Sequence, residues 1–349
     1  MAAGAVVGAA AGVLQASRVA GDYLVAPEAA AAPPAAAPLP LIAPLPRSEL
    51  HVEPLPAAAP TVFGAPDAEL LAQLGAARVT RVKMNQGGTS ISLRLDFANG
   101  ARAAFKPEQT FLHSDPRREI AAYRLDRLIG LGRVPPAKAT AIPLADVLAV
   151  AADPAARERV LAETRPRGGV LYGELSWWIP EIKYARIGRF SADEPEGRAL
   201  WLSYLQLGAQ IPSGLRPLVE GLAACVLFDV LTDNADRWSG NNLVTSPDDR
   251  ILYIMDNTMS FTTARYGNEM SLSMLHRVQV FPRGLVHRIR ALTEEQLAEA
   301  LEGGAGDTRL GRLLEPQEIH AVIARRDNLL KYIDQLIAAH GEAAVLAFP

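Results

Sequence analysis

The stretch TDNADRWSGNN, residues 232–242, gathers polar side chains directly after residues 217–231, an apolar segment with almost no charge. The apolar segment predicts a helix that is buried on most of its sides. Polar groups this dense are unfavourable beside a buried helix unless they face a cleft or bind an ion. The stretch therefore predicts a functional loop. A loop whose Asp and Asn side chains only cap turns is the alternative.

Asp236 and Asn241 lie five residues apart within this stretch. The same D-x-x-x-x-N spacing occurs in the catalytic loops of phosphotransferases, where the Asp accepts the proton of the substrate hydroxyl and the Asn binds a divalent cation. Hard divalent cations prefer oxygen ligands. The spacing predicts Asp236 as the catalytic base and Asn241 as a metal ligand.

A second acidic residue, Asp256, follows the apolar run Ile251–Met255. This run and Leu243-Val244 flank the turn residues 247–249 and predict a hairpin. Asp256-Asn257 would then stand at the end of a hydrophobic strand, twenty residues after Asp236, where kinases place their metal-binding Asp. An ordinary turn that ends a strand is the alternative.

The segment upstream predicts a hairpin followed by a helix. Residues 91–97 alternate apolar and polar side chains, Asn99-Gly100 is a tight-turn signal, and residues 101–105 return as a second strand. Asp115 and Pro116 are a favourable N-cap and first helical residue for a helix that continues to about Ile129.

Lys106 ends the second strand of this hairpin, and Glu119 lies on the helix that follows. A strand lysine paired with a helix glutamate orients the phosphates of ATP in kinases. The alternative is that both side chains are exposed and solvated. Gly87-Gly88-Thr89, just before the first strand, would let backbone N–H groups approach a phosphate, although two glycines more often form only a turn.

Composition divides the chain. Ten of its 26 prolines lie between Pro27 and Pro60. We expect a weakly apolar segment over residues 1–24, an Ala/Pro-rich extended tether over 25–63, and a folded domain over 64–349. Residues 2–15 are too short for a standard membrane span and lack a preceding basic region, so a loose membrane anchor, a frayed helix and a misassigned start all remain open.

Charge and cysteine content exclude other classes. The net charge of −3 argues against a dedicated nucleic-acid binder, and the scattered histidines have no metal-binding spacing. The single cysteine, Cys225, excludes an intramolecular disulfide framework and a cysteine zinc cage. With no clear signal peptide, a reducing compartment, the cytoplasm, is the expectation. The oligomeric state stays open.

The predicted strands cluster early and the predicted helices late. Thr293 and Gln296 form a capping box for one late helix. Residues 315–339 form a long last helix, on which we expect Arg325 and Arg326 to be a solvated face. We therefore predict an α+β fold with a small sheet-rich N-lobe (about 64–182) and a larger, mainly helical C-lobe (about 183–349).

The chain resembles the secretory-pathway kinases, an atypical protein-kinase-like family that includes the Golgi casein kinase, the glycosaminoglycan xylosylkinase and four-jointed. The resemblance covers roughly residues 84–280. The segments that carry it are Phe105-Lys106-Pro107, Glu119-Ile120-Ala121-Ala122, Val134-Pro135-Pro136, Asn234-Ala235-Asp236-Arg237 and Asp256-Asn257, with Gly87-Gly88-Thr89 similar to the glycine-rich turn and Tyr172-Gly173-Glu174-Leu175 faintly similar to a strand.

The resemblance implies a two-lobed kinase-like fold that uses ATP with Mn²⁺ or Mg²⁺. Lys106 would hold phosphates, Glu119 would orient Lys106 or the metal, Asp236 would be the base, and Asp256 the main metal ligand. Asn241 fits the general kinase spacing rather than the pattern of this family. Animal members carry several disulfides, and in that respect this chain departs from them.

Three functions follow as hypotheses. The leading one is a phosphotransferase that moves the γ-phosphate of ATP to a hydroxyl of a protein or a glycan. The second is a pseudokinase scaffold that binds nucleotide or a partner without catalysis, against which the joint presence of Lys106, Glu119, Asp236 and Asp256 argues. The third is a tethered interaction domain that binds neither ATP nor metal.

Overall fold

The computed structural model describes residues 61–85, 89–240, 242–302 and 307–349. Gly87, Gly88, Asn241 and almost all of the expected N-terminal segment and tether lie outside these residues. The proposed domain limits therefore stay predictions. No helix in the described part of the chain is both long enough and apolar enough to cross a membrane.

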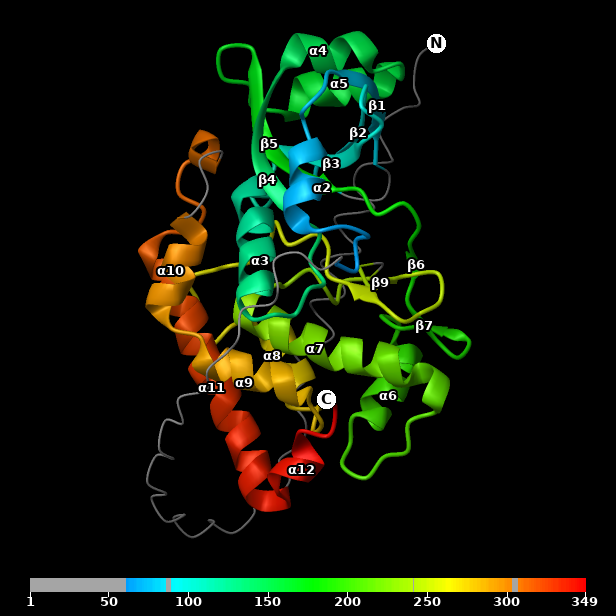
Figure 1. Cartoon of the computed structure of the whole chain (residues 1–349), viewed down its shortest axis with the longest axis vertical. Helices are drawn as coiled ribbons and strands as arrows, with labels where there is room; N and C mark the ends of the chain where they lie inside the picture. The colour runs from blue at the N-terminus through cyan, green and yellow to red at the C-terminus, as the bar shows by residue number, and fades with distance from the viewer. Residues whose placement is uncertain (1–60, 86–88, 241, 303–306) are drawn as a thin grey trace, which may run out of the picture. The chain divides into compact units, whose positions relative to one another are not determined.

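The first part of the fold is a five-stranded antiparallel sheet with the strand order β1-β2-β3-β5-β4 (Figure 1). Its strands are β1 (Val79–Met84), β2 (Leu93–Phe97), β3 (Arg102–Pro107), β4 (Ala137–Pro143) and β5 (Val170–Trp177). β2 and β3 form the hairpin that the sequence predicts. Helix α2 (Asp67–Gln73) precedes the sheet, and α4 (Leu144–Val150) and α5 (Pro154–Glu163) lie between β4 and β5 in the chain.

One face of this sheet is an apolar core. Period-two alternation directs Leu93, Phe105 and Leu175 to it, and each is fully buried together with Val147 of α4 and Val160 of α5. The alternate residues of β3 and β5 therefore face the other way. Lys106 and Glu174 are among these alternate residues.

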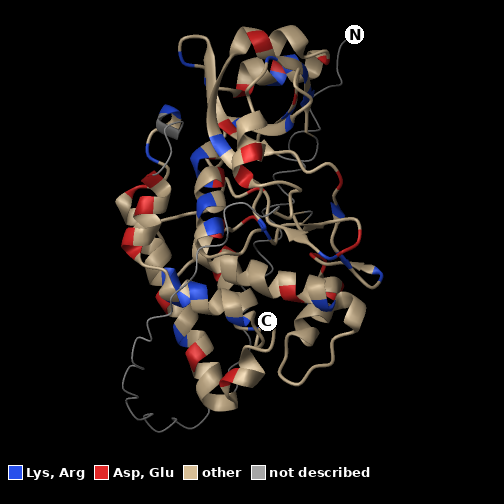
Figure 2. Ribbon diagram, in the orientation of Figure 1, with Lys and Arg blue, Asp and Glu red and all other residues tan. Residues whose placement is uncertain are grey.

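Helix α3 (Pro116–Leu128) begins as the sequence predicts, because the Asp115 side chain accepts a hydrogen bond from the Arg117 N–H and Pro116 occupies the first turn. Its apolar residues, with Leu125 fully buried, belong to the core of the helical part of the fold. Figure 2 shows basic residues along α3 and acidic residues along α10 (Glu294–Glu302), two helices that contact each other. Arg124 donates to the carbonyl oxygens of Ala300 and Leu301.

The second part of the fold is mainly helical and is built around α7 (Arg216–Thr232), which is buried along most of its length. The other helices of this part are α6 (Pro195–Tyr204), η1 (Ser213–Leu215), α8 (Glu269–Leu275), α9 (Arg283–Ala291), η2 (Asp307–Leu310), α11 (Pro316–His340) and α12 (Glu342–Val345). Short strands accompany them: β6 (Lys183–Tyr184), β7 (Arg186–Ile187), β8 (Phe190–Ser191), β9 (Val244–Thr245) and β10 (Leu252–Tyr253). The sheet-rich early part and the helical late part confirm the expected α+β class.

The predicted hairpin over residues 243–255 is shorter than expected, since only Val244–Thr245 and Leu252–Tyr253 pair. The Ile254 N–H instead donates to the Arg133 carbonyl oxygen, and Asp256 turns the chain with a φ of 58°. Asp256 therefore lies beyond the paired residues of this hairpin.

The expectation that Arg325 and Arg326 form a solvated face is wrong. Arg325 is 0% exposed and lies on the same stripe of α11 as Ala321, Val322 and Leu329, which are buried. Its guanidinium donates to the carbonyl oxygens of Leu231, Thr262 and Ala264. Two adjacent helical residues point about 100° apart, so they cannot share one face. Arg325 instead joins α11 to the end of α7 and to the segment that follows Asp256.

We expect R325A to lower the free energy of unfolding by about 3 kcal/mol, because it leaves buried carbonyl oxygens without donors. Urea unfolding followed by circular dichroism measures this loss. The control is R290A, which removes an exposed ion pair between Arg290 of α9 and Asp334 of α11 and should cost less than about 1 kcal/mol. Equal losses in the two variants would contradict the role assigned to Arg325.

Candidate active site

Lys106 is the centre of a buried charged cluster. Its Nζ lies 2.6 Å from Oδ1 of Asp256 and 3.5 Å from Oε2 of Glu119. The Lys106 and Glu119 residues are 7% and 3% exposed, whereas the Asp256 side chain is 45% exposed. The alternative that Lys106 and Glu119 are separately solvated is therefore wrong. Strand β3, helix α3 and the segment that follows β10 each bring one charged side chain to this point.

Electrostatics keeps this lysine protonated. Burial disfavours the ammonium form, but the carboxylates of Asp256, Glu119 and Glu174 outweigh burial and raise the pKa of Lys106. Burial also opposes ionisation of Asp256, and here Lys106 prevails and lowers the pKa of that carboxyl. Lys106 and Asp256 are consequently both charged at neutral pH.

Asn257 forms shorter hydrogen bonds to Glu119 than Lys106 does. The Asn257 backbone N–H donates to Oε2 of Glu119 at 2.7 Å, and its side-chain amide donates to Oε1 at 3.0 Å. Both glutamate oxygens are thus taken by the residue next to Asp256. This contact connects α3 to the end of β10.

Arg237 connects the polar loop of residues 232–242 to the same point. It is 1% exposed, forms an ion pair with Asp229 of α7 at 3.2 Å, and donates to Oδ1 of Asn257 at 2.8 Å. It also donates to the Met255 carbonyl oxygen. Burial raises the pKa of Asp229 to about 6, although Arg237 partly offsets this. Arg237, the residue next to Asp236, therefore connects the loop to α7 and to Asn257.

Asp236 is half-buried and is held by its own loop. The Asn234 side chain accepts from the Asp236 N–H at 3.0 Å and donates to the Asp256 carbonyl oxygen at 3.3 Å, which ties the two segments together. Ser239 donates to Oδ1 of Asp236 at 2.8 Å, and Asn242 donates to Oδ2 at 3.3 Å. Sequence spacing selected Asn241, which lies outside the described residues, and missed the neighbouring amide of Asn242.

Thr89, the described member of the glycine-rich turn, is exposed, and its carbonyl oxygen accepts from Arg159 of α5. The described contacts of Thr89 thus connect it to α5. Whether Gly87 and Gly88 cradle a phosphate stays a prediction.

Glu174 is a buried acid opposite Lys106 that the sequence patterns do not predict as part of the cluster. It pairs with Lys106 across β3 and β5, is 0% exposed, and accepts a hydrogen bond from Ser176 on Oε2. Burial, reinforced by the charge of Glu119, raises its pKa to about 8. The sequence signal was a single acid between Gly173 and Leu175 within an apolar strand.

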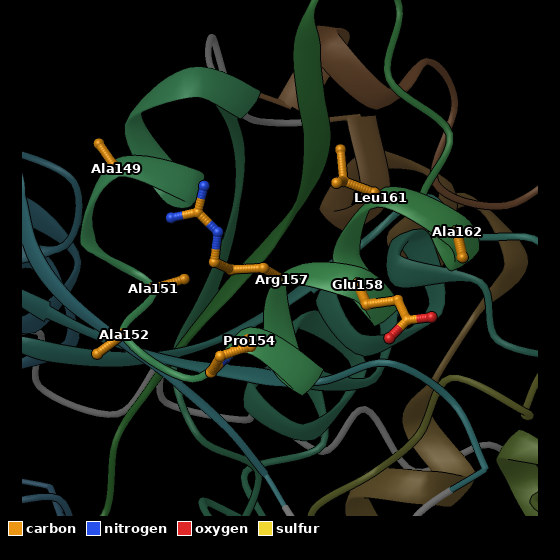
Figure 3. Close-up of a pocket in the computed structure, with 8 residues that line it drawn as sticks. All are labelled: Ala149, Ala151, Ala152, Pro154, Arg157, Glu158, Leu161 and Ala162. Carbon is orange, nitrogen blue, oxygen red and sulfur yellow. The ribbon is translucent and has the colours of Figure 1, made fainter.

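A surface hollow elsewhere does not belong to this site. It has a volume of roughly 840 Å³ and lies on α4 and α5, where mostly small side chains line it together with Arg157, Glu158 and Leu161 (Figure 3). Arg157 extends across it and donates to the Leu148 carbonyl oxygen. The hollow contains none of the charged residues grouped around Lys106.

Comparison with known proteins identifies relatives of the chain. No protein-family model matches it. It is 25% identical to the mouse pseudokinase FAM20A over 82% of its length, which spans 61% of that protein. It is 20% identical to the human glycosaminoglycan xylosylkinase over 77% of its length and 75% of that protein. Over 80 residues, 19% of the chain and 14% of the relative, it is 42% identical to the human extracellular serine/threonine protein kinase FAM20C.

Solved structures share the fold. The Golgi casein kinase with Mn/ADP bound superposes with a TM-score of 0.62 at 16% identity, over 80% of this chain and 78% of that one. Hydra Fam20 with sugar superposes with a TM-score of 0.60 at 19% identity, over 80% and 92% of the two chains. The chain thus has the two-lobed kinase-like fold that the sequence predicts, and its resemblance to the secretory-pathway kinases is confirmed.

The raised pKa of Glu174 predicts a pH-dependent stability. A carboxyl that titrates at 4.5 when unfolded and near 8 when folded keeps its proton longest in the folded state. Stability therefore falls as the pH rises from about 4.5 to 8. E174Q removes this effect, so its melting temperature should exceed that of the native protein by a margin that grows from pH 5 to pH 8. Parallel melting curves across this range would contradict the assignment.

Proposed function

We propose that this protein is an ATP-dependent phosphotransferase that moves the γ-phosphate to a hydroxyl of an acceptor. The observation that carries the proposal is the convergence of Glu119 and Asp256 on the Lys106 ammonium. Asp236 stands in a loop that Asn234 joins to Asp256. The similarity to kinases in sequence and fold supports the same reading.

Each side chain has a role that its environment supports. Lys106, kept positive by the surrounding carboxylates, would bind phosphate oxygens. Glu119, fixed by both donors of Asn257, would hold Lys106 in place. Gly87, Gly88 and Thr89 would cover the phosphates with backbone N–H groups.

The donor set fits a hard divalent cation such as Mn²⁺ or Mg²⁺. Among the described residues there is no group of three His, Cys, Asp or Glu side chains that could hold a metal by themselves. Nucleotide-dependent sites commonly use one or two carboxylates and complete the shell with phosphate oxygens and water. The half-exposed carboxylate of Asp256 suits such a site, with Asn241 as the second proposed ligand. When bound, the cation neutralises charge on the phosphates.

Transfer would then need one proton acceptor. The acceptor hydroxyl oxygen forms a bond to the γ-phosphorus, the bond from that phosphorus to the β–γ bridging oxygen breaks, and ADP leaves. Asp236 takes the hydroxyl proton. Ser239 and Asn242 keep its carboxylate oriented. Lys106 stabilises negative charge on the phosphate oxygens.

The acceptor is proposed by class, a Ser/Thr hydroxyl of a protein or a hydroxyl of a glycan. Relatives with kinase names include both a glycosaminoglycan kinase and a serine/threonine protein kinase. The second candidate function is a nucleotide-binding pseudokinase, which the similarity to the pseudokinase FAM20A favours. Turnover distinguishes the two, because a pseudokinase binds nucleotide without transferring phosphate.

Replacing Asp236 should remove activity and leave binding. We expect D236A to lower the rate of ATP consumption with Mn²⁺ or Mg²⁺ by about 10²- to 10⁴-fold, the contribution of a general base. The thermal shift caused by ADP and Mn²⁺ should stay close to that of the native protein. Mass spectrometry of autophosphorylation gives an independent readout of transfer.

The matched control is D334N, which removes an exposed carboxylate paired with Arg290 and should leave turnover unchanged. Unchanged turnover in D236A would refute the base assignment. A native protein that shows a thermal shift with ADP and Mn²⁺ but transfers phosphate to no acceptor would favour the pseudokinase.

Replacing Asn257 should disturb the hydrogen bonds that hold the Glu119 carboxylate in place. In N257D a carboxylate oxygen replaces the amide that donates to Oε1 of Glu119, so two negative oxygens meet in a buried site. We expect at least about a 10-fold weaker affinity for ADP with Mn²⁺, measured by titration calorimetry. N328D, at an amide that donates to the Arg265 carbonyl oxygen, is the control, and equal affinities in both variants would contradict this role.

A further inference from the structure

Glu174 has a buried carboxylate that the proposed mechanism does not use. In the register of β3 and β5 it stands directly opposite Lys106. Paired residues of antiparallel strands project their side chains from the same face of the sheet. Since Phe105 and Leu175 fill the apolar core on the other face, Glu174 shares with Lys106 the face that carries the charged cluster.

The position of Glu174 is fixed closely. The adjacent Gly173 lies so near β3 that a Cβ at this residue would stand 2.4 Å from the Lys106 carbonyl oxygen. Ser176 donates to Oε2 of Glu174 at 2.7 Å. The other oxygen, Oε1, is buried and has no hydrogen-bond partner among the described residues. A buried carboxylate oxygen without a partner is unfavourable, so its place beside the site suggests a use there.

The other carboxylates of the cluster are already occupied. Both oxygens of Glu119 accept from Asn257, and the Lys106 contact to Glu119 is long, at 3.5 Å. The short contact of Lys106 goes to Oδ1 of Asp256. In this arrangement Lys106 and Asp256 neutralise each other, although the proposed function assigns one to phosphate and the other to the cation.

Cation and nucleotide must therefore compete with the Lys106–Asp256 ion pair. When Asp256 turns to the cation, the Lys106 ammonium exchanges its nearest protein counter-charge for phosphate oxygens, and only the long contact to Glu119 among its printed side-chain contacts still holds it in place. Glu174 has the one buried carboxylate oxygen in the described cluster that lacks a hydrogen-bond donor.

We propose, resting on the proposed function, that Glu174 is a positioning residue for Lys106 and that its Oε1 accepts the ammonium once Asp256 engages the cation. Glu174 thereby stabilises the loaded state, in which nucleotide and cation are bound. In the unloaded state, without these ligands, Glu174 is a buried acid with one unsatisfied oxygen, which lowers the stability of the fold. Its removal should accordingly have opposite effects on the two states.

The experiment compares the native protein with E174Q, E174D and the control E163Q, which changes a partly exposed glutamate paired with Arg159 on α5. Thermal melting without ligand measures the unloaded state, and calorimetric titration with ADP in the presence of MnCl₂ measures the loaded state. E174Q should melt at the native temperature or above it. Its Kd for ADP with Mn²⁺ should rise about 10- to 100-fold, as for the loss of a charged hydrogen bond.

The remaining variants make the proposal falsifiable. E174D retains a carboxyl group and should recover part of the affinity, while E163Q should stay within about 2-fold of the native Kd. A Kd of E174Q within 2-fold of native overturns the inference and leaves the proposed function intact. If E174Q is both less stable and weaker in ADP binding, Glu174 only supports the fold, and this result also overturns the inference. If the native protein binds no ADP with either Mn²⁺ or Mg²⁺, the proposed function itself fails.

Discussion

The buried ammonium of Lys106 is the constraint on which the rest of the site depends. A lysine removed from water must be surrounded by carboxylates, or it would lose its proton or destabilise the fold. Here Glu119 comes from α3 and Asp256 from the chain after β10, 150 residues beyond Lys106. Meeting this one electrostatic requirement fixes how the sheet, α3 and the end of β10 are placed against one another.

A second layer of polar contacts makes that placement rigid. Asn257 binds both oxygens of Glu119, and Arg237 binds Asn257 and Asp229, so one chain of contacts runs from α3 to the buried helix α7. Every member of this chain is buried and hydrogen-bonded, which makes each dependent on the others. Asp236, next to Arg237 in the sequence, remains half-buried at the end of this chain of contacts.

Much of this arrangement could be read from the sequence. Local signals specified the β2–β3 hairpin, the Asp115 cap of α3, the apolar α7 and the capping box of α10. Long-range features were less accessible. Arg325 was expected to be solvated because local sequence does not show which carbonyl oxygens from distant segments will pack against an arginine. Glu174 was overlooked as a site residue because only strand register places it opposite Lys106.

By itself the sequence determined the α+β class, the order of the elements and the kinds of residue that are proposed to carry the chemistry, because turns, caps and periodicity act over a few residues. It could not determine which of those residues meet. Three carboxyl groups surround one lysine because antiparallel pairing sets β5 beside β3 and because Asn257 binds α3 across 138 residues of chain. Those distances, and the unsatisfied oxygen of Glu174, exist only after the chain has packed.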